Sequence, residues 1–323
     1  MNDYVLYGKG SAYRGLQQMT IGVWFTQEFK DMVEWIKQYN STKAFQDKVK
    51  FYGCDMQFAV NSGGALKNGL IKLQNPLSAE AQKGLDLIIP WGFIKVSKED
   101  MLFMKTLATE LGYATLIEPD LNKLKIDKQC IKAIIQTVEY AEAAPSWFKQ
   151  DIIRDKLMAG NSEWIYNYES KNKMIIWAHN LHIAKDAAKN NNLPMGYYLA
   201  QKFPNDYYAM GFGFSSGKLK AYNKEQGKSM INSIPEVQIK NSSDYIFKQI
   251  SVPNFILDFQ TSSANPQIAD FLNQKQNARS IGALYDDKKE AEGGGGSYQK
   301  LIKMYDALIF IRETNASTPI KSE

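Results

Sequence analysis

Histidine and cysteine are the scarcest reactive residues in this chain. Its 323 residues include two histidines and two cysteines, Cys54 and Cys130. Two cysteines so far apart cannot form a metal-ligand cluster. A reduced pair in a large domain is favoured over a disulfide, which stays an alternative. We therefore expect a cytoplasmic chain as written, unless an export signal once preceded Met1.

Long apolar runs and basic blocks are also missing. No run reaches the ~18 residues of a membrane span, and the N-terminus lacks a leader-like pattern. Lysine and arginine number 39 against 34 aspartate and glutamate, a net charge of +5 without clustering. This pattern predicts no membrane partner and disfavours nucleic acid. With 44% hydrophobic and 23% charged residues, the composition is that of a folded globular protein of unspecified oligomeric state.

Two common catalytic motifs lack their proper setting as well. Gly213-Phe214-Ser215-Ser216-Gly217 matches Gly-x-Ser-x-Gly in letters, but it continues the strand-like segment of Gly211-Phe212-Gly213 and indicates neither a nucleophile elbow nor a phosphate-binding loop. Neither cysteine lies in a reactive context. These absences favour water as the nucleophile over covalent catalysis.

Hydrophobic periodicity predicts strands that alternate with helices. Helices are expected at 22–39 (with Thr26 as N-cap), 98–112, 127–144, 147–168, 195–203 and 267–273. Strands are expected at 49–56, 174–179, 206–214, 254–259 and 307–311. This alternation is typical of an α/β fold with a mainly parallel sheet flanked by helices.

The predicted organisation has an inserted helical lobe. Residues 1–77 and 171–323 are expected to form the α/β domain, and residues 78–170 a helical lobe or lid. Residues 293–297 read Gly-Gly-Gly-Gly-Ser, the composition of a flexible linker. A natural surface loop and an engineered loop replacement both explain this run.

Both histidines lie in one tetrapeptide, His179-Asn180-Leu181-His182. Imidazole is the side chain best suited to move protons near neutral pH. Reactive groups of parallel α/β sheets collect beyond the carboxyl ends of strands, and His179 follows the predicted strand MIIWA. We predict a functional role for His179. For His182, bracing the loop is an equal alternative.

Two further side chains are candidates for the same site. Asp55 ends the predicted strand 49–56 and could orient His179, or merely cap its own loop. Arg154 could clamp a substrate carbonyl, although a packing role is common for such an arginine. A metal shared by the two histidines would need a third ligand such as Asp55 or Asp186, and no spacing singles either out.

Several segments together resemble the erythromycin esterase-like family. The resemblance rests on WAHNLHIAKD (177–186), PMGYYLAQKF (194–203) and DYYAMGFGFSSGKLKAY (206–222), supported by KFYGCDMQ (50–57), RDKLMAGNSEWI (154–165), RSIGALYDD (279–287) and MYDALIFIRETNASTP (304–319). Each motif is weak alone, but their order is fairly specific, and they run from about residue 2 to 320.

The resemblance implies a hydrolase that uses no metal or other cofactor. Its best-known members open the macrolactone ring of erythromycin-type antibiotics, with a histidine acting as general base on water. It therefore implies an ester or lactone as small-molecule substrate. Carried over by motif, His179, His182 and Asp55 would be catalytic, and Arg154 and Asn180 substrate-binding.

One part of the family pattern has no match in this chain. The family opens with a strand that ends in a Gly-Glu-x-x-His-Gly motif, the source of its expected general base. The chain has no third histidine to replace it, and its start resembles the segment that normally follows this motif. We therefore expect a truncated and impaired hydrolase. The alternative is a non-catalytic relative that binds a small molecule.

Overall fold

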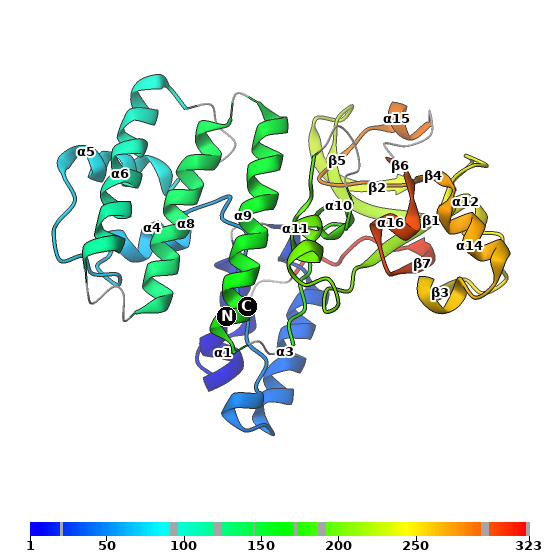
Figure 1. Cartoon of the computed structure of the whole chain (residues 1–323), viewed down its shortest axis with the longest axis horizontal. Helices are drawn as coiled ribbons and strands as arrows, with labels where there is room; N and C mark the ends of the chain where they lie inside the picture. Colours follow the sequence, from blue (N-terminus) through cyan, green and yellow to red (C-terminus); the bar gives the residue numbers. More distant parts are fainter. Residues whose placement is uncertain are drawn as a thin grey trace. The chain divides into compact units, whose positions relative to one another are not determined.

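The chain forms two compact units (Figure 1). The computed structural model describes residues 1–19, 22–90, 96–118, 124–144, 146–170, 173–186, 192–291 and 297–320. Unit 1 comprises Met1–Lys171 with Ile320–Glu323, and unit 2 comprises Asn172–Pro319. Residues 1–77, which the sequence groups with the sheet domain, thus belong to the same unit as the helices of 78–170.

Unit 1 is built from helices in its described part. They are α1 (Asn2–Tyr7), α2 (Ala12–Gln17), α3 (Gln27–Ser41), α4 (Val60–Lys67), α5 (Ala79–Ile88), α6 (Lys98–Ile117), α8 (Lys125–Glu142) and α9 (Trp147–Tyr168), with short 3-10 turns η1 (Gly22–Trp24) and η2 (Phe45–Asp47). The predicted helices over 98–112, 127–144 and 147–168 are confirmed as α6, α8 and α9. Thr26 caps α3 as predicted, accepting a hydrogen bond from the Phe29 N–H.

Two apolar clusters hold unit 1 together. One joins α4, α5, α6 and α8 around Leu85, Leu107 and Ile134, which are almost fully buried. The other joins α1, α2 and α3 around Leu16 and Val33. The helices of 78–170 therefore share one apolar core with α4, which precedes them in the chain.

Residues 49–56 form no strand, so this prediction is wrong. The side-chain amide of buried Asn40 donates to the Val49 carbonyl and accepts from the Val49 N–H, both at 2.8 Å. Asn2 makes the same pair of bonds with Phe51, also at 2.8 Å. Two carboxamides thus satisfy backbone groups that a neighbouring strand would otherwise pair.

Unit 2 contains the sheet. Its helices are α10 (Asn180–Ile183), α11 (Met195–Lys202), α12 (Ser243–Phe247), α13 (Phe259–Ser262), α14 (Pro266–Asn273), α15 (Asp287–Ala291) and α16 (Leu301–Met304). Its strands are β1 (Met210–Asn223), β2 (Lys228–Ile234), β3 (Asn254–Asp258), β4 (Lys275–Ala278), β5 (Leu284–Tyr285), β6 (Ser297–Lys300) and β7 (Ala307–Thr314). The predicted elements at 195–203, 254–259, 267–273 and 307–311 are confirmed, and the strand predicted from 206 begins at Met210.

The fold is α/β with a sheet flanked by helices, as predicted, but the sheet is mixed rather than mainly parallel. The strand order is β2-β1-β7-β3. β1 runs parallel to β7 and to the short β5, whereas β2 and β3 pair antiparallel to their neighbours. β4 and β6 form a separate antiparallel pair. β2 follows β1 by a tight turn, which forces an antiparallel pairing that strand-helix alternation does not reveal.

The covered face of the sheet packs against short helices. Leu308 and Phe310 of β7 lie in one apolar cluster with Phe247, Phe259 and Leu272 from α12, α13 and α14. Ala184, just after α10, belongs to the same cluster. The histidine-bearing turn is therefore attached to the core of unit 2.

Residues 174–179 form no strand, although the sequence strongly favours one. Ile175 is 94% exposed and Trp177 is 64% exposed. In the described part of unit 2, no strand pairs with this segment. An apolar run becomes a strand only where a partner completes its hydrogen bonds, so the pattern alone is insufficient.

The glycine-rich run falls largely outside the described residues. This applies to residues 293–296, while Ser297 opens β6. Among the helices that are described, none combines the length and apolar character needed to cross a bilayer.

Candidate functional site

His179 is the N-cap of the one-turn helix α10. Its backbone is extended, and its Nδ1 accepts a hydrogen bond of 3.2 Å from the Leu181 N–H. The carbonyl of His179 also accepts the backbone N–H of His182 at 2.8 Å. The two histidines therefore lie on one turn because the first of them caps the helix that carries the second.

The other ring nitrogen of His179 faces a loop of unit 2. Nε2 lies 3.4 Å from the carbonyl oxygen of Ile281. Because Nδ1 accepts a hydrogen bond, a neutral ring carries its proton on Nε2 and donates it toward Ile281. Burial lowers the pKa of His179 below its ordinary value, and the charge of His182 lowers it further. His179 is thus a neutral imidazole near pH 7.

The two imidazoles lie edge to face. Their ring centroids are 6.5 Å apart and the ring planes are inclined by 77°. This spacing lets both rings act on one small functional group. His182 is partly buried.

Asn180 attaches this turn to the first strand. Its amide nitrogen donates to the Phe212 carbonyl at 2.6 Å, and its amide oxygen accepts the Phe212 N–H at 3.0 Å. The hydroxyl of Tyr305 donates to the Asn180 carbonyl at 3.3 Å. The side chain predicted to bind substrate therefore binds β1, and its predicted substrate role stays a prediction.

Close packing fixes the far end of the turn. A Cβ atom on Gly196, near the start of α11, would lie 2.1 Å from the Ile183 carbonyl oxygen. Any larger residue would push α11 away from α10. The Met195-Gly196 start of α11, within the segment 194–203 that supports the resemblance, thus serves this contact.

A small cavity of about 20 Å³ lies beside the turn, enough for one water molecule. Its lining includes Asn180, Phe212, Asp244, Arg279 and Tyr305. Neither Asp244 nor Arg279 stands out in the sequence analysis as a site residue. Arg279 opens the segment RSIGALYDD that supports the resemblance, but no motif marks Asp244, and both residues lie more than 60 positions from the histidines along the chain.

Asp244 is a buried carboxylate, 2% exposed. Its Oδ2 accepts the Arg279 backbone N–H at 2.7 Å, and the Phe214 N–H also bonds to the carboxylate. Burial raises its pKa to about 6. The guanidinium of Arg279 pairs with buried Glu290 at 2.6 Å instead.

Asp55 and Arg154 form a separate pair in unit 1. The Arg154 Nη2 lies 2.7 Å from Asp55 Oδ2, and its Nε donates to both carboxylate oxygens at 3.2 Å. Asp55 also accepts the Gln57 N–H at 3.0 Å, the capping role left open as an alternative. The pair joins residues 99 positions apart, and its predicted catalytic and substrate roles stay predictions.

The two cysteines are free thiols, and burial raises the pKa of each. Across the described ranges, no three or more His, Cys, Asp or Glu side chains are grouped to hold a metal ion.

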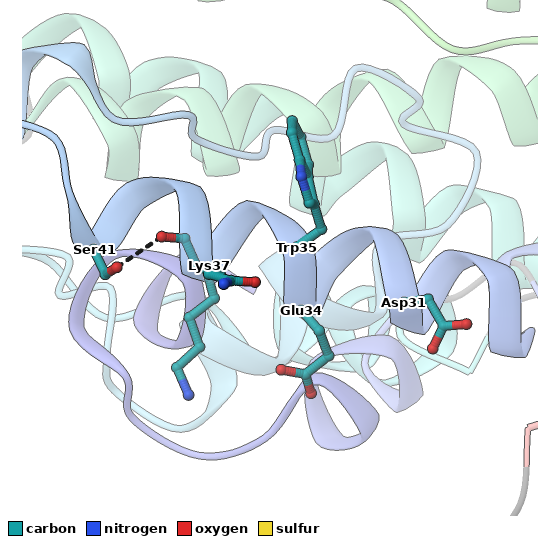
Figure 2. A pocket seen from close by; sticks show the side chains of 6 residues that line it. Asp31, Glu34, Trp35, Lys37 and Ser41 are labelled. Carbon is teal, nitrogen blue, oxygen red and sulfur yellow. Dashed lines mark hydrogen bonds between the residues drawn. The ribbon is translucent and has the colours of Figure 1, made fainter.

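A surface hollow on α3 holds none of the predicted residues. It is lined by six side chains of that one helix: Asp31, Glu34, Trp35, Lys37, Gln38 and Ser41. Figure 2 shows Trp35 projecting to the opposite side of α3 from Glu34 and Lys37. A single helix surface does not enclose a ligand, so we assign it no function.

Comparison with protein families places these features in context. The family described as erythromycin esterase matches residues 1–314. A curated relative that is named as a hydrolase, YbfO of Bacillus subtilis (strain 168), is 22% identical over 334 aligned positions. That alignment covers 93% of this chain and 70% of YbfO.

Solved structures share the fold. A succinoglycan biosynthesis protein superposes with a TM-score of 0.75 at 20% identity, covering 99% of this chain and 77% of that one. A Bacillus cereus protein gives 0.75 at 21%, covering 99% and 79%. A histidine-to-asparagine mutant of the erythromycin esterase EreC, in its open conformation, gives 0.62 at 14%, covering 96% and 81%. At these identities the likeness shows the fold alone.

Proposed function

The chain belongs to the erythromycin esterase family, and from that membership we propose that it hydrolyses an ester or lactone by base-assisted attack of water. The observation that carries this proposal is the placement of both imidazoles of the chain on one helical turn, 6.5 Å apart. A neutral imidazole is a competent base or hydrogen-bond donor at pH 7.

The two rings have different roles in this proposal. His179 uses its Nδ1 to cap α10, so its Nε2–H, which lies 3.4 Å from the Ile281 carbonyl oxygen, is the donor for which a substrate carbonyl would compete. His182 then takes the proton from the attacking water. The ring spacing suits two imidazoles acting on the carbonyl and the water of one reacting centre.

The expected rate is low. The 323 residues contain no Glu-x-x-His motif. Loss of a placed general base lowers a rate by ~10²–10⁴-fold. We therefore expect slow hydrolysis of a small-molecule substrate such as a large, macrolide-like lactone, and no binding to nucleic acid or membranes.

A non-catalytic relative that binds the same class of molecule is the second candidate. One observation favours it: the Nδ1 lone pair of His179 is occupied by the Leu181 N–H. A ring held in this way serves recognition as well as catalysis.

Turnover of two substrates separates the candidates. An erythromycin-type macrolactone, followed by mass spectrometry, and a 4-nitrophenyl ester are incubated with wild type, with the double variant His179→Gln/His182→Gln, and with Lys228→Gln, an exposed control on β2. We expect wild type and control to exceed the double variant at least ~10-fold.

Equal rates for wild type and the double variant would show that His179 and His182 take no part in the hydrolysis. No product above buffer from wild type would reject catalysis. Calorimetric binding of the macrolactone would then support the second candidate.

A further inference from the structure

We propose that Asp244 is a positioning residue, which acts through the loop at 279–282 and, together with the Leu181 N–H, holds His179 in its Nε2–H tautomer. The inference rests on the proposed function for its catalytic meaning, while its geometry stands apart from any activity. Asp244 does not touch His179. It acts on the ring through the backbone that the ring faces.

The carboxylate joins two segments of backbone. Its Oδ2 accepts the Arg279 N–H at 2.7 Å, and the Phe214 N–H of β1 bonds to the same group. A Cβ atom at Gly213 would come within 2.8 Å of Oδ1, so glycine is needed for this approach. Asp244 thus fastens the loop to the strand that also holds Asn180.

The loop is anchored at its first residue in several ways. The Arg279 guanidinium donates to the Ser215 carbonyl and, at 3.0 Å, to the Pro235 carbonyl. It also forms the buried ion pair with Glu290. With both the backbone and the side chain of residue 279 held, the loop has little freedom two residues later.

Two residues beyond Arg279 lies the contact with the imidazole. The Ile281 carbonyl is 3.4 Å from His179 Nε2, and a Cβ at Gly282 would be 4.0 Å from the same atom. A carbonyl at this place can only accept, so it favours the Nε2–H form of the ring. The Leu181 N–H favours the same form from the other side.

Asparagine cannot replace the two acceptor oxygens of Asp244. A carboxylate has two acceptor oxygens, one for each backbone N–H. Asparagine would direct an NH₂ group toward one of these donors and lose that bond. A buried carboxylate is costly to maintain, and the two segments it joins both reach the histidine turn.

Nuclear magnetic resonance of the two histidines tests the proposal on the full chain. Ring ¹⁵N shifts report the tautomer, and a His182→Gln spectrum assigns the signals. We expect wild-type His179 in the Nε2–H form. In Asp244→Asn we expect a detectable fraction of the Nδ1–H form, because the Ile281 carbonyl is no longer held against Nε2 and only the Leu181 N–H still favours the Nε2–H form.

Two further variants keep the test decisive. Gly213→Ala replaces Asp244→Asn in the test if the latter does not fold. Its Cβ would crowd Asp244 from the side of β1, and we expect the same change in the His179 tautomer. Asn232→Ala removes a buried polar side chain elsewhere in unit 2 and should leave the ring signals unchanged.

An unchanged tautomer of His179 in folded Asp244→Asn would overturn the proposal. If ester hydrolysis is measurable, its kcat should fall about tenfold in that variant with KM unchanged. A ring shift without any hydrolysis in wild type would retain the positioning role and reject the proposed function.

Discussion

At the scale of single residues, His179 owes its properties to its backbone position. A histidine at a helix N-cap uses Nδ1 for the cap and keeps one nitrogen for other contacts. Its neighbour His182 lies on the same turn and contributes a charge when protonated. The sequence shows that the two histidines are close, and the cap explains which nitrogen each contact uses.

This arrangement predicts the pH behaviour of His179. Its pKa should lie below the ordinary 6.5, and His182→Gln should raise it because the repulsive charge is removed. Since the folded pKa is lowered, its contribution to stability is complete above pH ~6.5 and decreases as the pH falls below that value. Proton NMR titration of the ring measures the shift. A His179 pKa at or above that of the unfolded chain contradicts the assignment.

The Asp55–Arg154 pair predicts a stability effect in unit 1. The side chains are 20% and 17% exposed. Asp55→Asn leaves the guanidinium without its carboxylate and should lower the free energy of unfolding by about 2 kcal/mol. Urea unfolding followed by circular dichroism measures this difference.

Asp86→Asn is the matched control, because its ion pair with Lys67 is about half exposed. It should leave the unfolding midpoint unchanged. Equal effects of the two substitutions would show that the Asp55 pair adds nothing specific.

The sequence shows that candidate residues lie close together only where they are neighbours in the chain. His179, Asn180 and His182 were identifiable from one tetrapeptide. Asp55 and Arg154 were identified singly, but their contact spans 99 positions and no local pattern reveals it. Asp244 was missed because a lone aspartate at the start of a five-residue helix resembles an ordinary cap.

At the scale of elements, asparagine carboxamides replace neighbouring strands in three places. Asn2, Asn40 and Asn180 each bind both the N–H and the carbonyl of one residue in an extended segment. Apolar runs at 49–56 and 174–179 predict strands, but neither segment forms one. Helix predictions succeeded more often because a helix completes its hydrogen bonds within its own segment.

The Asn40 carboxamide should contribute measurably to the free energy of unfolding. Its side chain is 1% exposed and bonds to Val5 as well as to both backbone groups of Val49. Asn40→Ala leaves these buried groups unpaired and should destabilise unit 1 by roughly 2–3 kcal/mol. The exposed Asn61→Ala, which loses one bond to Gln18, should have a much smaller effect in the same denaturation experiment. A similar loss for both would refute this interpretation.

At the scale of the whole molecule, the fold class was predictable but its sheet direction and division into units were not. Strand-helix alternation indicates α/β architecture, and the structure has it. The antiparallel neighbours β2 and β3 follow from turns and long connections whose direction the local pattern does not encode. The assignment of residues 1–77 to unit 1 depends on packing between helices distant in sequence.

Asp244 predicts the acid dependence of the folded state. Its pKa is about 6 in the folded chain against 3.8 for an ordinary aspartate. The folded state therefore binds the proton more tightly, so stability should decrease as the pH rises from about 4 to about 6, by on the order of 3 kcal/mol in total. The difference in unfolding free energy between wild type and Asp244→Asn isolates this slope. A difference independent of pH across that window contradicts it.

The uncovered segment at 174–177 has a practical consequence for anyone who purifies the protein. The side chain of Ile175 is almost fully exposed, two residues from the exposed Trp177, so this apolar surface can promote association between molecules. Ammonium sulfate should precipitate wild type at a lower concentration than Ile175→Lys, with identical melting temperatures for the two. Equal precipitation points would show that the exposed Ile175 side chain does not promote association in solution.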